Sequence, residues 1–117
     1  MNILPKADSA VIPMEKLIGY ALHPVKSKGK HYAFDKALGY NLENAEKLLA
    51  NIQRNITKFP AVAKGNNSYG ETYQILMVLT GENNKTANVM TAWIDDAITG
   101  EMRLTSAYIK KRGAKND

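Results

Sequence analysis

Hydrophobic side chains recur with a helical period in the first half of the chain and with a period of two in the second half. The period changes at a cluster of turn residues, Gly65 to Gly70. A helical period predicts amphipathic helices, whereas strict alternation predicts strands with one buried face. Helices followed by an antiparallel meander make an α+β domain, which is the fold class we expect.

Three helices are expected before the turn cluster. The first begins at Pro13, since proline suits the first turn of a helix, and ends at His23, because a residue before proline avoids the helical region. The second begins between Gly29 and His31 and ends at Gly39, which fits a helix C-cap. Asn41 caps the third, which Pro60 stops. The apolar stripes of these helices are expected at Met14, Leu17, Ile18, Ala21 and Leu22, at Phe34, Ala37 and Leu38, and at Leu42, Ala45, Leu48, Leu49, Ile52, Ile56 and Phe59.

Three strands are expected after the turn cluster, over residues 71–79, 86–94 and 103–109. Gly81 to Asn84 is typical of a hairpin connection between the first two. The predicted architecture is therefore a set of N-terminal helices packed on a twisted antiparallel β-sheet.

A single domain is expected over residues 13–110, because no repeat and no linker divides that range. Residues 1–12 are expected to be a lead-in, and residues 111–117 a frayed basic tail. No apolar run approaches the roughly 18 residues of a membrane span. The start of the chain also lacks the apolar stretch of a signal peptide. Export would then require a larger polypeptide or a route that this chain does not encode.

The 117 residues carry a formal charge of +5, which favours a polyanionic partner such as nucleic acid, an anionic membrane or an acidic protein. The chain has no cysteine, so it has no disulfide, no thiol nucleophile and no thiolate metal site.

The only two histidines, His23 and His31, flank a loop that contains Lys26, Lys28 and Lys30. Imidazole exchanges protons near neutral pH, and lysines attract phosphate. RNA can be cut without a metal when its 2′-hydroxyl attacks the adjacent phosphate, a step that needs a base, an acid and cations. The alternative is that both histidines are surface residues and the lysines a soluble loop. Two histidines without a carboxylate cluster make a metal site less favoured, and we expect neither metal nor cofactor.

The last expected strand contains a second candidate group, in which alternation places Ser106 and Tyr108 on one face. A hydroxyl and a phenol at this spacing could hold a phosphate and orient a ribose or base. Arg103 and Thr105, expected on the opposite face, are further candidates for substrate binding. The alternative is that Tyr108 is buried on the sheet, that Ser106 lies at its rim and that Arg103 is an ordinary exposed charge.

Trp93 and Asp35 are two further candidates. Trp93 is a candidate platform for a base, although a lone tryptophan is more typical of a core. Asp35 lies one helical turn beyond His31 and is expected to be able to orient its ring.

The order of several short blocks resembles a family of C-terminal nuclease domains from bacterial polymorphic toxins, including contact-dependent growth-inhibition toxins. The blocks are residues 12–22, His23-Pro24 to Gly29-Lys30-His31, residues 37–40, Thr91-Ala92-Trp93-Ile94 and residues 103–108. The resemblance covers about residues 11–110. Such domains are similar to the barnase–EndoU–colicin–RelE group, in which N-terminal helices pack on a twisted antiparallel sheet.

The resemblance implies RNA cleavage without a metal, with tRNA as the expected substrate and a cyclic phosphate as the product. It implies His23, His31, Lys30, Ser106 and Tyr108 as catalytic residues. Relatives place another lysine where this chain has Tyr32, so that Lys28 or Lys30 is the expected catalytic cation. The expected substrate-binding residues are Lys26, Lys28, Arg103, Thr105 and Trp93.

A toxin of this kind implies further partners and a place of action. A cognate immunity protein, acidic where it meets the basic site, is expected, and a host factor is a further partner. The domain would be secreted or delivered from the cell surface as part of a larger toxin and would act in the cytoplasm of the target cell. Two alternatives stay open: a non-catalytic basic module that binds nucleic acid or protein, and a structural accessory domain.

Overall fold

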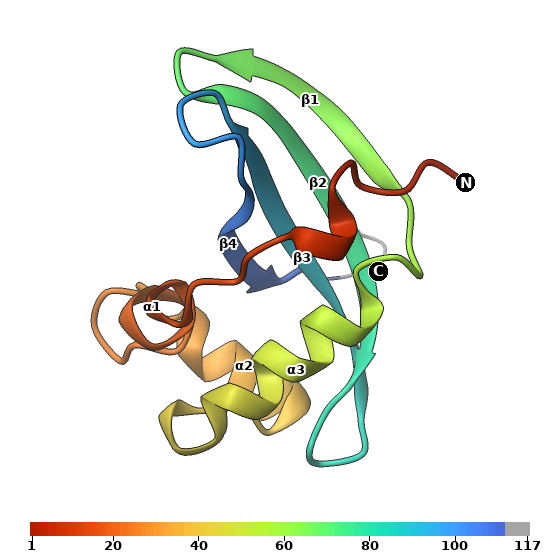
Figure 1. Ribbon diagram of the computed structural model, residues 1–117. Coiled ribbons are helices and arrows are strands. Elements are labelled where there is room, and N and C mark those ends of the chain that lie inside the picture. Colours follow the sequence, from red (N-terminus) through yellow and green to blue (C-terminus); the bar gives the residue numbers. More distant parts are fainter. Residues whose placement is uncertain (112–117) are drawn as a thin grey trace.

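A four-stranded antiparallel sheet with the order β1-β2-β3-β4 forms one layer of the molecule, and helices pack against one of its faces (Figure 1). The computed structural model describes residues 1–111. The strands are β1 (Ala61–Asn67), β2 (Gly70–Thr80), β3 (Thr86–Asp96) and β4 (Met102–Ile109). The α+β class is confirmed, with the helices preceding the sheet in the sequence.

The helical layer follows the predicted order. The first expected helix is a continuous segment made of α1 (Met14–Lys16) and η2 (Leu17–Ala21), whose wider turn lets the Leu22 N–H donate to the Leu17 carbonyl at 2.7 Å. The second is α2 (Lys30–Leu38), which Gly39 ends with a left-handed φ of 75°. The third is divided into η3 (Leu42–Asn44) and α3 (Ala45–Asn55). A short turn, η1 (Ala7–Ser9), precedes them all.

The core lies between the two layers and uses most of the predicted stripes. Each fully buried aliphatic or aromatic side chain stabilises the fold by roughly 1.5–3 kcal/mol relative to exposure. Ile18 and Leu42 were expected in the core but are 43% and 45% exposed. The most enclosed helical side chains are Leu17, Phe34, Leu38, Leu48 and Ile52, and the most enclosed strand side chains are Ile75, Met77, Leu79, Val89, Trp93 and Leu104.

Strand β1 was not predicted, because residues 65–70 were interpreted as a turn alone. Only its first residue, Ala61, is buried, and the other six are exposed. The strand has one neighbour, β2, and its register shifts between Ala63 and Gly65. An exposed edge strand shows no alternation between apolar and polar residues, so its pattern could not identify it.

The lead-in is part of the folded unit. Leu4 is 2% exposed within the core. The Ala61 N–H donates to the Asn2 carbonyl at 2.7 Å, and Val11 forms an isolated parallel bridge with Arg103 of β4. Residues 1–12 therefore contact both edge strands of the sheet, β1 and β4. The frayed tail expected from residue 111 onward lies, apart from Lys111, outside the described residues.

The β2–β3 hairpin holds the end of α2. A Cβ atom on Gly81 would lie 2.1 Å from the Leu38 carbonyl oxygen, so only glycine permits this approach. The Glu82 N–H donates to the same carbonyl at 2.8 Å. The C-terminus of α2 is thus fixed on the hairpin, while its N-terminus reaches the basic loop. Within residues 1–111, no helix has both the length and the apolar character needed to cross a membrane.

Candidate functional site

A basic cleft of about 390 Å³ lies where η2, the loop after it, the start of α2 and strand β4 meet. Four of its lining residues are lysines, and no carboxylate is among the described residues that line it. A cleft lined by one sign of charge concentrates ligands of the opposite sign. The lining residues of this basic cleft are Lys16, Tyr20, Ala21, Lys26, Ser27, Lys28, Lys30, Thr105, Ser106 and Ala107.

The loop of residues 22–29 turns sharply into α2. Lys28 and Gly29 both have left-handed backbone conformations, with φ of 55° and 93°. Such a conformation is uncommon for a lysine, which marks the turn as specifically shaped. Lys30 then begins α2, so Lys28 and Lys30 flank the N-terminus of this helix at the cleft. The helix dipole adds partial positive charge at the same place.

His31 is held by Ser27, a buried residue that the sequence analysis missed. The Ser27 Oγ lies 3.0 Å from His31 Nδ1 and accepts the backbone N–H of His31 at 3.0 Å. A hydroxyl can donate to an unprotonated nitrogen or accept from a protonated one. Ser27, which is 5% exposed, can therefore hydrogen-bond the Nδ1 atom of either His31 tautomer. Asp35 was expected to orient this ring, but the structure gives that position to Ser27.

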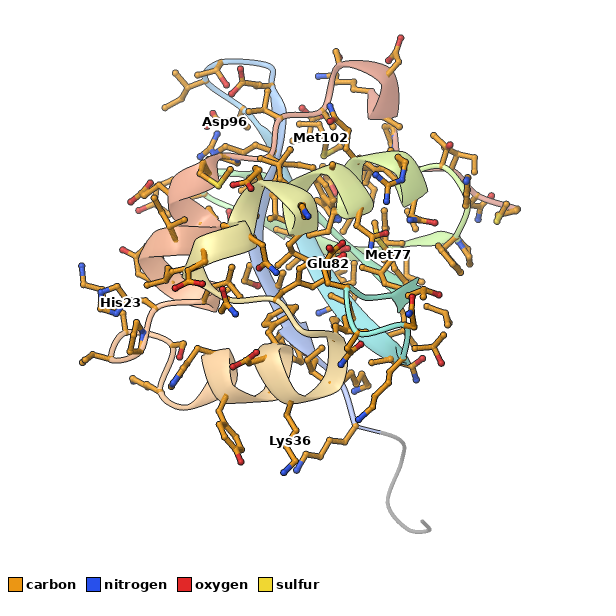
Figure 2. All side chains as sticks on the ribbon, turned by 90° about the horizontal axis from the view of Figure 1, so that it is seen from below. His23, Lys36, Met77, Glu82, Asp96 and Met102 are labelled. Atoms are coloured by element: carbon orange, nitrogen blue, oxygen red, sulfur yellow. The ribbon has the colours of Figure 1, made fainter. Side chains whose placement is uncertain are left out.

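His23 has a different role from the one expected of it. Its Nδ1 accepts the backbone N–H groups of Val25 and Lys26, both at 3.1 Å. A proton on Nδ1 would break both hydrogen bonds, so the ring acts as the acceptor that starts the loop turn. Figure 2 shows His23 at the outer edge of the molecule. Neither His23 nor His31 is among the residues that line the basic cleft, but His31 contacts the lining residue Ser27. The hydrogen bonds of His23 favour loop shaping over the shared acid/base role that was expected.

Strand β4 brings Ser106 to the cleft and Tyr108 beside Lys30, a lysine that lines it. Ser106 is exposed and lines it, and the Lys30 Nζ lies 4.9 Å from the centroid of the Tyr108 ring. These two residues share a face as predicted, since they pair with Ala92 and Met90 of β3 without an interruption. Three of the predicted catalytic residues, Lys30, Ser106 and Tyr108, therefore meet at one place.

The predicted assignment of the other β4 residues to faces was wrong. The register between β3 and β4 shifts by one residue at this point. Leu104 pairs with Trp93 and Ser106 pairs with the adjacent Ala92, so Thr105 is an extra residue in β4. Such a bulge reverses the alternation. Leu104 and Ala107 are consequently both buried, although they were expected on opposite faces. Thr105 lines the cleft, and its hydroxyl donates to the Ala92 carbonyl at 3.2 Å.

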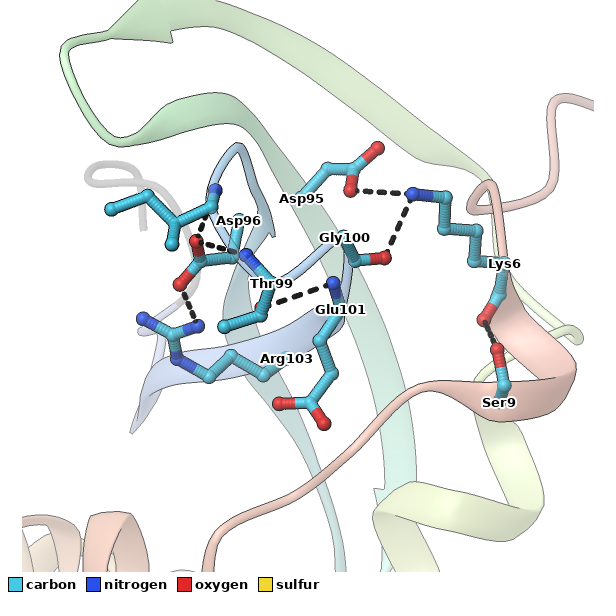
Figure 3. A network of polar contacts seen from close by, with 9 residues as sticks. Lys6, Ser9, Asp95, Asp96, Thr99, Gly100, Glu101 and Arg103 are labelled. Atoms are coloured by element: carbon cyan, nitrogen blue, oxygen red, sulfur yellow. Dashed lines mark hydrogen bonds and ion pairs between the residues drawn. The ribbon is translucent and has the colours of Figure 1, made fainter.

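Arg103 does not line the basic cleft. Its guanidinium pairs with the Asp96 carboxylate at the connection between β3 and β4, as Figure 3 shows. The hydrogen bond from Arg103, together with the N–H groups of Ile98 and Thr99, lowers the pKa of Asp96 to about 2. Arg103 therefore fixes this connection instead of contacting a substrate in the cleft as was expected.

A second ion pair lies beside the first. The Lys6 Nζ lies 2.8 Å from Asp95 and donates to the Gly100 carbonyl at 2.9 Å (Figure 3). This pair ties the lead-in to the same connection.

Trp93 belongs to the core, which corrects the expectation that it binds substrate. It is 1% exposed, and its indole N–H donates to the Thr91 hydroxyl at 2.8 Å. A ring enclosed to this extent offers no face to a base.

Tyr20 and Lys16, by contrast, line the cleft but were not singled out in the sequence. Their spacing of one helical turn was the available signal.

Residues 3–111 match the model of a family described as a domain of unknown function (DUF6883). The chain belongs to the DUF6883 family. Comparison with curated proteins and with solved structures gave no match. The match includes both the lead-in and β4, so the whole of the basic cleft lies inside the family domain. No group of three or more histidine, cysteine, aspartate or glutamate side chains placed to hold a metal ion occurs in residues 1–111.

Proposed function

We propose that this DUF6883 domain is a ribonuclease that cuts RNA, with tRNA as the favoured substrate, by attack of the 2′-hydroxyl on the adjacent phosphate. The observation that carries the proposal is the gathering of four lysines, Ser27 and Ser106 around one cleft, with the His31 ring joined to that lining through the Ser27 hydroxyl. Cleavage by this route gives a cyclic phosphate and requires proton transfer and charge stabilisation from the protein.

In the proposed mechanism, the His31 ring takes the proton from the 2′-hydroxyl. Ser27 supports this step because its oxygen can accept an N–H from Nδ1, and in that tautomer Nε2 is unprotonated and can take the proton. The Lys30 ammonium, next to Tyr108, neutralises the charge that develops on the phosphate and supplies a proton to the leaving oxygen. Lysine is among the side chains that act as general acids.

The remaining cleft residues bind and position the substrate. Lys26 and Lys28 attract the neighbouring phosphates, and Ser106 and Thr105 offer hydroxyl groups along the edge of β4. Tyr108 positions the Lys30 side chain through its ring. His23 shapes the loop that carries these lysines.

The biological setting that fits this activity is growth inhibition between bacteria. The domain would be delivered as part of a larger secreted or surface-bound toxin and would act in the cytoplasm of the target cell. An acidic immunity protein that covers the basic cleft would protect the producing cell, since complementary charge speeds and orients association. Expression of the domain in bacteria, with growth and RNA integrity as readouts, tests this setting.

A second candidate function is a non-catalytic basic module that holds nucleic acid or an acidic protein. The observation that favours it is the use of His23 as a loop acceptor, which leaves one imidazole rather than two beside the cleft. Incubating the pure domain with total tRNA in EDTA separates the two functions. Intact tRNA at a large excess of protein would favour the binding module.

A further inference from the structure

Tyr20 is an exposed aromatic ring close to two cations at the basic cleft. Its side chain is 47% exposed. The Lys16 Nζ lies 5.2 Å from the ring centroid and the Lys26 Nζ lies 5.9 Å from it. All three residues line the cleft. One ligand in the cleft would therefore meet a ring face and two positive charges together.

A second ring with the same type of neighbour comes from the β4 side. The Lys30 Nζ lies 4.9 Å from the centroid of Tyr108, which is half-buried. Tyr108 comes two residues after Ser106, which lines the cleft. The two rings come from η2 and β4, which are far apart in the sequence, and the lysines beside them come from α1, the loop before α2 and the start of α2.

Resting on the ribonuclease function proposed above, we propose that the basic cleft binds unpaired RNA, with one base stacked on the Tyr20 ring. The adjacent phosphate lies between Lys28 and Lys30. Proteins hold single strands by combining a basic groove with aromatic rings on which bases stack, whatever the base sequence. In a duplex the bases are stacked on one another, so their faces are closed to Tyr20. The substrate class is therefore loops, bulges and ends.

The two lysines beside Tyr20 are compatible with stacking. An exposed cation–π contact changes an equilibrium constant by only about 2-fold to 5-fold. Stacking of a base on an aromatic side chain changes it by about 5-fold to 150-fold. A base therefore displaces one lysine from the ring. The displaced ammonium stays within reach of the phosphate on either side of that base, where it adds to the binding.

The test measures binding of a fluorescent, 2′-O-methylated single strand, which cannot be cut by its own 2′-hydroxyl, and of a duplex of the same length and backbone. Fluorescence anisotropy gives both dissociation constants for the wild type and three variants. Tyr20→Ala removes the ring, and Tyr20→Phe keeps it. Tyr69→Ala is the matched control, because Tyr69 is 67% exposed in the β1–β2 turn, away from the cleft. Cleavage of unmodified RNA by each variant is measured in parallel.

We expect Tyr20→Ala to weaken single-strand binding by about 5-fold to 150-fold and duplex binding by less than about 2-fold. Tyr20→Phe and Tyr69→Ala should bind as the wild type does. Equal binding of strand and duplex, or no effect of Tyr20→Ala, overturns the stacking site while cleavage of RNA leaves the ribonuclease function intact. Absence of both binding and cleavage overturns both. Binding of polyglutamate as tightly as RNA would assign the cleft to an acidic protein partner.

Discussion

The Ser27 hydroxyl oxygen lies 3.0 Å from the His31 Nδ1 atom and 3.0 Å from the backbone nitrogen of the same residue. One buried hydroxyl therefore fixes both the ring of His31 and the first turn of α2. Ser27 is a positioning residue in the proposed mechanism, because it acts on the substrate only through His31. Loss of the Ser27 hydroxyl should therefore change kcat and the free energy of unfolding by different amounts.

Replacing Ser27 with alanine should lower kcat for RNA cleavage by about 10²-fold, the usual effect of a small misplacement of a reacting group. KM should stay within a few-fold of the wild type, since Ser27 contributes no charge to substrate binding. The free energy of unfolding should fall by about 1 kcal/mol through loss of the hydrogen bond to the His31 N–H. Steady-state kinetics and urea unfolding measure the two effects. Ser27→Thr keeps the hydroxyl and is the control; an Ala variant with wild-type kcat contradicts the positioning role.

The two histidines should respond differently to asparagine. His31→Asn removes the proton-transfer group and should lower the cleavage rate by roughly two or more orders of magnitude. His23→Asn replaces the Nδ1 acceptor with an amide oxygen that can accept the same two N–H groups, and should keep the rate within a few-fold. His23→Ala removes the acceptor and should lower the free energy of unfolding by about 1 kcal/mol. A folded, inactive His23→Asn protein would return His23 to the catalytic group.

The lysines of the cleft should set the salt dependence of RNA binding. Each lysine that contacts a phosphate contributes about 0.7 to the slope of log K against log salt for a single strand. Lys28→Ala and Lys30→Ala should each reduce that slope by about this amount. Lys85→Ala, an exposed lysine in the β2–β3 turn, should leave the slope unchanged. The measurement is a salt titration of binding to the uncleavable strand, and equal slopes for all three variants would argue against the cleft.

Asp96 should make the fold sensitive to acid. Because the hydrogen bond from Arg103 lowers the pKa of this carboxyl from 3.8 to about 2, the folded state favours the charged form. This contribution to stability is complete above pH 4 and is lost as the pH falls toward 2. Asp96→Asn should be less stable than the wild type at neutral pH, and the difference should shrink between pH 4 and pH 2. Urea unfolding across this range measures it, and a difference independent of pH would contradict the pairing.

Much of the fold followed from periodicity, because buried residues repeat at regular spacing in α3, in the second half of β2 and in β3 up to Trp93. Prediction failed for segments whose few buried residues form no periodic pattern in the sequence. The edge strand Ala61–Asn67 is exposed along nearly its whole length, and the lead-in contributes a single buried side chain, Leu4. The bulge at Thr105 shifted the register of β4, and no local signal in the sequence marks it.

The candidate site was predicted in part. Lys26, Lys28, Lys30 and Ser106 could be selected by charge and spacing, and they do meet at the cleft. Ser27 looked like an ordinary loop residue, since its contact with His31 depends on the left-handed turn at residues 28 and 29.

The residues predicted wrongly were misplaced by tertiary contacts. Trp93 and Arg103 were selected by residue type. Trp93 is buried in the core, however, and Arg103 forms an ion pair with Asp96.

The central claim is that the cleft cuts RNA through His31. The most direct measurement incubates the pure domain and its His31→Asn variant with total tRNA in EDTA and identifies the ends of the fragments. We expect the wild type to give fragments ending in a 2′,3′-cyclic phosphate and the variant to leave the tRNA intact. Intact tRNA with the wild type, or equal cleavage by both proteins, would contradict it.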